Sequence, residues 1–192
     1  MVVLSNESSE HGVVCADAVR FGGGMGNISR GGKISGLPRY LEGARYSAQW
    51  AGMPYDVYAG RKGENDYTDD INTRSNTINY LSGGSVYNPG QTGLGVPLEM
   101  TMALHSDAGC SKDDEIIGSL GIYTTDFNNG KLNMGTDRYA SRDLADILLT
   151  QIQKDIRSSY NLPWTRRRMW NLNYSETRLP ATPSTIIELL SH

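Results

Sequence analysis

The sequence lacks the marks of several well-known classes of protein. It has only two cysteines, Cys15 and Cys110, in different predicted units, so we expect no disulfide, and there is no CxxC metal motif. No run of about 18 apolar residues predicts a membrane span. The net charge of −3 argues against a nucleic-acid partner. What remains, with 38% hydrophobic residues, is a chain able to bury a core.

Glycine is plentiful, but its densest stretch lacks the features of a phosphate-binding loop. Residues 22–36 (GGGMGNISRGGKISG) follow no long strand and have no Lys-Ser/Thr ending. We therefore interpret residues 23–37 as a linker. Before it, the valine-rich runs Val2–Leu4 and Val13–Phe21 flank a polar turn, which predicts a two-stranded hairpin within residues 1–22 that stays outside the main sheet.

The rest of the chain alternates between helical and strand patterns. Helices are predicted at 38–51, at 71–81 with Asp69 or Asp70 as N-cap, and in a long segment capped by Ser141. That long helix carries an apolar stripe that we expect to be buried: Leu144, Ile147, Leu148, Ile152 and Ile156. Strands are predicted at 53–58, 98–104, 115–124 and within the last ten residues. This order predicts an α/β fold with a mixed or mainly parallel sheet.

His105 stands at the end of the predicted strand 98–104. Large apolar residues alternate along that strand, which predicts one buried face, and His105 falls on the opposite face. Active sites of open α/β sheets collect at the carboxyl ends of strands. A histidine there, with Asp107 two residues on, could be a metal ligand or an acid–base group. The alternative is a histidine that only hydrogen-bonds within the turn.

Glu188 interrupts the β-branched run Ser184–Ile187 near the end of the chain. A carboxylate inside an apolar strand needs a cation, a metal or a proton, because an unpaired buried charge is costly. Such a group suits a general base. The alternative is a structural ion pair with one of the nearby arginines, which are Arg166, Arg167, Arg168 and Arg178.

The predicted loop 160–178 combines arginines with aromatic residues. Trp164 and Arg166 are candidates to stack on a sugar ring and to bind a carboxylate of a substrate. The alternative is that the tryptophans of this loop pack it against the sheet.

Several segments together resemble the zinc-dependent N-acetylmuramoyl-L-alanine amidases of bacterial cell-wall turnover. These segments are LEGAR…AG, NTRSNTINYL, ALHSDAG, SRDLADILLTQIQKDI and RRRMWNLNYSETRLPATPSTIIELLSH, within residues 38–192. A closer resemblance is to large secreted Bacteroidetes proteins that carry such a domain and are often labelled xanthan-lyase-like. The family implies a three-layer α/β sandwich, one Zn²⁺, and hydrolysis of the amide between N-acetylmuramic acid and L-alanine in peptidoglycan.

The resemblance also implies roles for individual residues. His105 matches the strand-end zinc histidine, and Glu42 matches a zinc-binding glutamate at the start of a helix. Glu188 matches the late glutamate that acts as general base. Asp107 would orient His105, and Arg74 aligns with an arginine common at its helix, which ties loop carboxylates to that helix.

The sequence departs from the family in its first zinc ligand. A G-H-G-G-like turn is missing, and VVCADAVRF instead resembles the closing strand of the golvesin-C-terminal-like sandwich, a carbohydrate-binding type of module. We therefore expect residues 1–22 to be the end of such a sandwich and 38–192 to be an incomplete amidase-like domain. On its own this chain should be inactive, with the third ligand supplied by a longer secreted, periplasmic or cell-surface protein. The alternative is a non-catalytic glycan-binding or scaffold segment.

Overall fold

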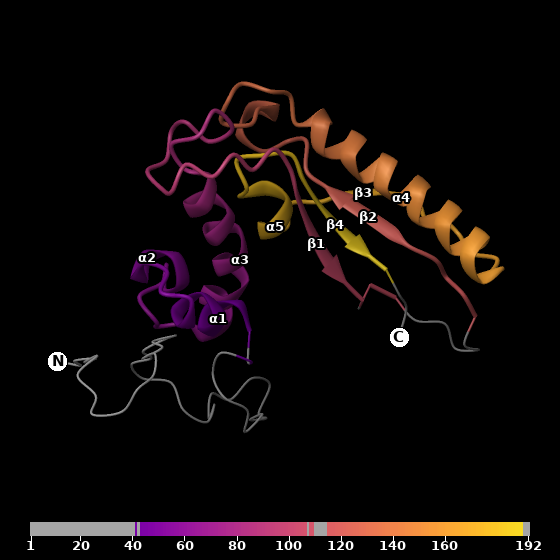
Figure 1. Cartoon of the computed structure of the whole chain (residues 1–192), viewed down its shortest axis with the longest axis horizontal. Helices are drawn as coiled ribbons and strands as arrows, with labels where there is room; N and C mark the ends of the chain where they lie inside the picture. Colours follow the sequence, from indigo (N-terminus) through magenta and orange to yellow (C-terminus); the bar gives the residue numbers. More distant parts are fainter. Residues whose placement is uncertain (1–40, 42, 107, 110–114, 190–192) are drawn as a thin grey trace, which may run out of the picture.

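The computed structural model describes residues 41, 43–106, 108–109 and 115–189 (Figure 1). The predicted hairpin and linker, together with Glu42 and Asp107, lie outside these residues. The helices are α1 (Ala44–Trp50), α2 (Tyr55–Tyr58), α3 (Asp66–Ser82), the 3-10 turn η2 (Asn128–Gly130), α4 (Tyr139–Tyr160) and α5 (Ser175–Arg178). The strands are β1 (Thr101–His105), β2 (Leu120–Tyr123), β3 (Trp170–Asn171) and β4 (Ser184–Glu188).

The four strands form one mixed sheet in the order β1-β4-β2-β3. Strand β1 runs parallel to β4, β2 runs antiparallel to β4, and β2 runs parallel to β3. The predicted α/β class with a mixed sheet is therefore confirmed. The long helix α4 lies along this sheet, while α1, α2 and α3 gather at one end of it (Figure 1).

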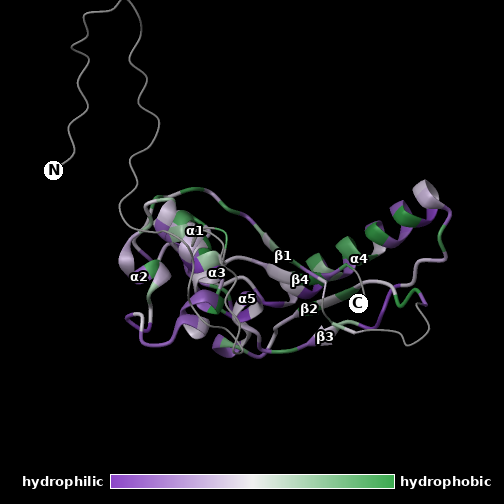
Figure 2. Ribbon diagram, turned by 90° about the horizontal axis from the view of Figure 1, so that it is seen from below, coloured by the Kyte–Doolittle hydropathy of each residue, from purple (hydrophilic) through white to green (hydrophobic). Residues whose placement is uncertain are grey.

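Helix α4 packs on one face of β2 and β4. Ala145 and Leu149 are its buried residues there, and a Cβ added to Gly121 of β2 would lie 3.0 Å from Leu149 Cδ1. Glycine at 121 thus lets the helix approach closely. The predicted stripe is wrong for Ile147, which is 65% exposed. Ile147 is two residues beyond Ala145 and so points about 200° away around the helix. Hydrophobic and hydrophilic residues alternate along the whole length of α4 (Figure 2).

The buried face of β1 is the opposite of the predicted one. Met102 and Leu104 are 48% and 59% exposed, whereas Ala103 packs against the apolar core of the sheet. Leu104 is the register partner of Ile187, so both lie on the face that α4 covers. Since α4 packs on β2 and β4, the large apolar side chains of the neighbouring β1 stay exposed on that face.

The helical end of the molecule differs from the prediction at three points. The helix predicted at 38–51 is α1 (Ala44–Trp50), and Gly43 is its N-cap. Residues 53–58 were expected to be a strand, but Tyr55–Tyr58 is the short helix α2, for which Pro54 is the N-cap. Proline has the fixed φ that suits a helix start. Helix α3 begins earlier than predicted, because Asn65 is its N-cap and accepts a hydrogen bond from the Thr68 amide. Asp69 is instead buried and accepts hydrogen bonds from the loop amides of Arg61 and Gly63.

Helix α3 holds the chain around α5 through polar contacts. Ser75 Oγ donates to the carbonyl of Ser175 at 2.9 Å, and Asn79 Nδ2 donates to that of Leu179 at 2.8 Å. The Asn79 side-chain oxygen also accepts from the Ala181 amide at 2.8 Å. These bonds fix α5 relative to α3 and to the strand β4 that follows.

Candidate active site

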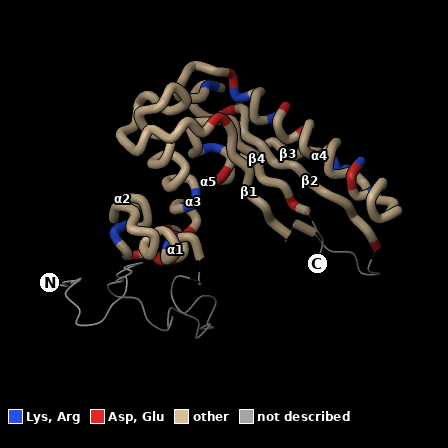
Figure 3. Tube along the Cα trace, in the orientation of Figure 1, with Lys and Arg blue, Asp and Glu red and all other residues tan. Residues whose placement is uncertain are grey.

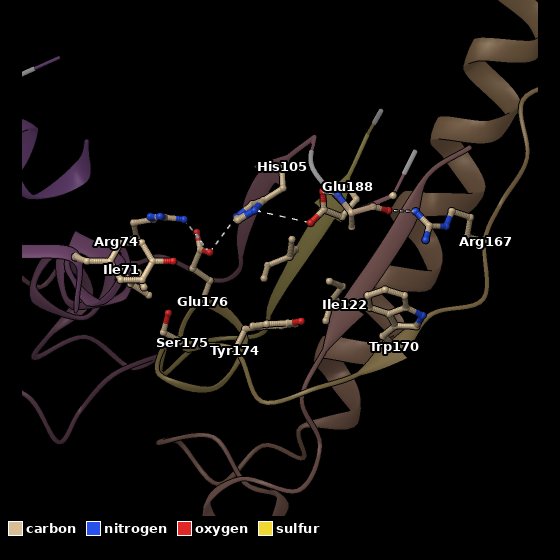
Figure 4. Close-up of a pocket in the computed structure, with 14 residues that line it drawn as sticks. Ile71, Arg74, His105, Ile122, Arg167, Trp170, Tyr174, Ser175, Glu176 and Glu188 are labelled. Atoms are coloured by element: carbon tan, nitrogen blue, oxygen red, sulfur yellow. Dashed lines mark hydrogen bonds and ion pairs between the residues drawn. The ribbon is translucent and has the colours of Figure 1, made fainter. Parts of the chain in front are cut away.

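A cavity of about 530 Å³ opens on the face of the sheet opposite α4. Ile122 and Ile186 form its apolar floor. Their chain neighbours lie on the other face of the sheet: the Ile187 side chain faces α4, as would a Cβ added to Gly121. Successive residues of a strand point to opposite faces, which explains this division. The walls come from α3, from the ends of β1 and β4, and from the segment that includes β3 and α5 (Figure 4).

His105 and Glu188 meet in this cavity. They are register partners at the carboxyl ends of the parallel strands β1 and β4, and His105 Nδ1 lies 3.8 Å from Glu188 Oε1. The structure thus brings these two candidate residues together in one cleft, at the ends of neighbouring strands. Glu188 is only 4% exposed, and its Oε2 accepts a hydrogen bond from the Ala108 amide at 3.2 Å.

Glu176 holds the other side of the histidine ring. His105 Nε2 donates to Glu176 Oε2 at 2.9 Å, and Arg74 Nη1 lies 3.0 Å from the same oxygen (Figure 4). Arg74 thus lies in the cavity wall and ties a carboxylate of another segment to α3, as the resemblance implied. Glu176 was not among the predicted site residues. It is the one acidic residue between Asp155 and Glu188, inside an arginine-rich stretch, and that isolation was the available signal for an ion pair.

The charges of this group shift the pKa values of two members. The hydrogen bond to Glu176 raises the pKa of His105, and the negative charges of Glu176 and Glu188 add to it, although burial and Arg74 oppose it. Burial raises the pKa of Glu176, but the contacts with His105 and Arg74 outweigh burial and lower it overall. A protonated His105 and an ionised Glu176 therefore stabilise each other.

Trp164 and Arg166 lie outside the cavity. Trp164 is buried, and its Nε1 donates to Ser119 Oγ at 2.9 Å, so it packs the loop against the sheet. Arg166 binds Thr150 and Asp146 on α4. The residues of the predicted loop 160–178 that line the cavity are Arg167, Trp170, Tyr174, Ser175 and Glu176. Residue 166 pairs with Ser119 in an extended bridge, so residues 166 and 167 point to opposite sides.

Arg167 closes the cavity next to Glu188. Its guanidinium donates to the carbonyl of Ala108 and lies 5.7 Å over the ring of Trp170 (Figure 4). Because the amide of the same Ala108 donates to Glu188, Arg167 helps to hold the peptide that positions this carboxylate.

The described residues contain no group of three His, Cys, Asp or Glu side chains that could hold a metal ion. They also contain no helix long and apolar enough to cross a membrane. Basic and acidic residues are mixed along α4, so that neither sign of charge is concentrated on it (Figure 3).

Comparison with known proteins gave no match to a family model, to a curated protein or to a solved structure.

Proposed function

We propose that this cavity is the catalytic cleft of a hydrolase that cleaves the amide between N-acetylmuramic acid and L-alanine in peptidoglycan or a related glycan amide. The observation that carries the proposal is the pairing of His105 with the buried Glu188 at two parallel strand ends, 3.8 Å apart and open to a cavity. An imidazole and a carboxylate at this spacing can act on one water molecule or one scissile group between them.

Glu188 would act as the general base. Its carboxylate takes a proton from the attacking water and returns it to the leaving amine, which is the task of a base within hydrogen-bond reach. The Ala108 amide fixes this carboxylate from one side. Glu176 fixes the His105 ring through Nε2, so that Nδ1 faces Glu188 across the reacting position. Arg74 in turn holds Glu176.

The resemblance implies a zinc ion, with His105, Glu42 and a histidine outside this chain as its ligands. Histidine and glutamate are suitable zinc ligands, and when bound the metal would acidify water and polarise the amide carbonyl. Within the described part of the chain, however, three ligands are not assembled. The zinc is therefore proposed from the resemblance alone, whereas the contacts that position Glu188 and Glu176 are made by the described residues.

The finer fold and the cellular context are part of the same proposal. The mixed sheet with α4 on one face and the cavity on the other is compatible with a three-layer amidase-like sandwich. The assignment of residues 1–22 to the closing strands of a golvesin-like β-sandwich and a secreted, periplasmic or cell-surface location follow from the resemblance.

A second candidate function is glycan binding without catalysis. The exposed aromatic residues of the cavity, Tyr67, Trp170 and Tyr174, favour it because aromatic rings can stack on sugar rings. In that case the charged group around His105 would orient a ligand without cleaving it.

The test measures release of L-alanine amino groups from a muramyl peptide by the zinc-loaded natural protein that carries this chain. Glu188→Gln should lower kcat by at least about 100-fold, the usual contribution of a general base. The control Glu64→Gln changes an exposed carboxylate in the loop before α3 and should leave kcat unchanged. Normal turnover by Glu188→Gln would exclude the catalytic role, and sugar binding without any turnover would favour the second candidate.

A further inference from the structure

Three exposed aromatic residues line the cavity; Tyr67 belongs to α3, and the other two, Trp170 and Tyr174, lie in the segment that includes β3 and α5. Trp170 is 38% exposed and Tyr174 is 46% exposed, although both line a concave pocket (Figure 4). Trp164, six residues before Trp170, differs from them: its side chain is buried, and its indole N–H donates a hydrogen bond to Ser119. Apolar area left open in a cavity is area that a ligand can cover.

Hydrogen bonds and one side-chain contact hold the chain at both aromatic residues. Trp170 belongs to β3 and pairs with Ile122 of β2, and the Arg167 guanidinium lies over its ring. Tyr174 is the N-cap residue of α5, and its amide donates to the carbonyl of Leu172 at 3.0 Å. A surface held in this way loses little conformational entropy when a ligand binds.

We propose that Trp170 and Tyr174, here called the aromatic wall, form a subsite that stacks on a pyranose ring of the substrate. This inference rests on the proposed function and extends it by naming the sugar side of the cleft. A pyranose has an apolar C–H face for an aromatic ring and a polar rim for hydrogen bonds. Both sides are present here, because charged side chains surround the rest of the cavity: Arg74, His105, Arg167, Glu176 and Glu188.

The aromatic wall also determines where a bound sugar ring would lie relative to His105 and Glu188. Tyr174 precedes Glu176 by two residues in one short segment, and Glu176 binds His105. In the close-up view, the two aromatic side chains and Ile122 lie on one side of the cavity, and His105 and Glu188 lie on the other (Figure 4). A sugar ring on the wall therefore presents its substituents to His105 and Glu188. The peptide part of the substrate would then extend toward α3 and Arg74.

The test uses a ligand that lacks the scissile amide. Binding of tri-N-acetylglucosamine to the full 192-residue chain is measured by titration calorimetry. Trp170→Ala and Tyr174→Ala should each weaken binding by at least about fivefold, the scale of one aromatic contact. Tyr174→Phe, which keeps the ring, should bind like the unchanged chain. The controls Trp50→Ala and Tyr160→Ala remove exposed aromatic residues that do not line the cavity.

The outcomes separate the wall from the catalytic proposal. Loss of sugar binding in the wall variants alone supports the wall, even if the protein hydrolyses no muramyl peptide. Equal binding by wall and control variants overturns the wall, even if Glu188-dependent hydrolysis is found. Absence of sugar binding by the unchanged chain also overturns it. Circular dichroism of each variant shows whether a loss of binding reflects loss of fold; where Trp170→Ala unfolds, the comparison of Tyr174→Ala with Tyr174→Phe decides.

Discussion

Replacing Glu176 by glutamine should destabilise the protein in a way that depends on pH. The carboxylate takes part in two charge-assisted contacts, with His105 at 2.9 Å and with Arg74 at 3.0 Å. A hydrogen bond to a charged group contributes about 1.5–3 kcal/mol when it is well shielded. Glutamine keeps the shape and one acceptor oxygen, and the partners are partly exposed to screening water. We therefore expect the free energy of unfolding to fall by about 1–2 kcal/mol.

The pH range of this effect follows from the directions of the two pKa shifts. The pKa of His105 is raised by Glu176, so its contribution is fully present below the ordinary value of 6.5 and is lost as the pH rises through the pKa of the folded protein. The pKa of Glu176 is lowered, so its contribution is present above the ordinary value of 4.5 and is lost as the pH falls through the folded pKa. The variant should therefore differ most from the unchanged chain between pH 4.5 and 6.5.

The assay is urea unfolding at about pH 5.5 and about pH 9, combined with an NMR titration of the His105 ring. Glu176→Gln should lower the pKa of His105 and lose less stability at the higher pH. Glu64→Gln, the exposed control, should change neither quantity. An unchanged His105 pKa in Glu176→Gln, or an equal loss of stability at both pH values, would refute the reasoning from the ion pair.

Three further predictions concern the backbone, the core and the metal. Gly118→Ala should lower the free energy of unfolding by about 2 kcal/mol or more, because φ is +78° and the new Cβ would lie 2.0 Å from the Thr165 carbonyl oxygen. Gly135→Ala shares the positive φ without a neighbour within 4 Å, so in urea unfolding it should cost clearly less. Leu149→Ala should cost about 2–5 kcal/mol in the same assay, because this side chain is buried against β2. When the chain is loaded with zinc and then dialysed, metal analysis should find less than one equivalent of zinc retained per chain. One full equivalent of zinc that is lost in His105→Ala would contradict this.

The strand-end site was predictable because it depends on short patterns. His105 and Glu188 each follow an apolar run, and side chains at the carboxyl ends of neighbouring parallel strands meet at one edge of the sheet. The sequence did not say that β1 and β4 are neighbours. The register of the structure shows that they are.

Alternation shows which residues share a face, but not which face is covered. Met102 and Leu104 were assigned to the buried face of β1 because they are large and apolar, yet α4 packs on β4 and β2 instead. The position of a helix across a sheet depends on packing between distant segments. In β2, Gly121 admits α4 closely, and a glycine in a short strand does not by itself reveal its partner.

For a similar reason, local sequence patterns could not show which of the two tryptophans lines the cavity. Trp164 and Trp170 stand in the same loop beside arginines, and Trp164 was a candidate for the substrate role, with packing of the loop against the sheet as the alternative. Its indole N–H finds Ser119, 45 residues earlier in the chain, and this partner decides its burial. Glu176 binds His105 across 71 residues. Contacts of such separation are set by the whole fold.

The polar attachment of α3 to the chain around α5 has a consequence for temperature. Ser75 and Asn79 make this contact through hydrogen bonds, whereas α4 meets the sheet through aliphatic side chains such as Leu149. Hydrophobic stabilisation weakens on cooling, because apolar hydration carries a large heat capacity. Cold should therefore loosen the α4 side of the sheet before it disturbs the alignment of Arg74 with Glu176. The polar wall of the cleft formed by Arg74 and Glu176 is therefore less sensitive to cold than the packing of α4 on the sheet.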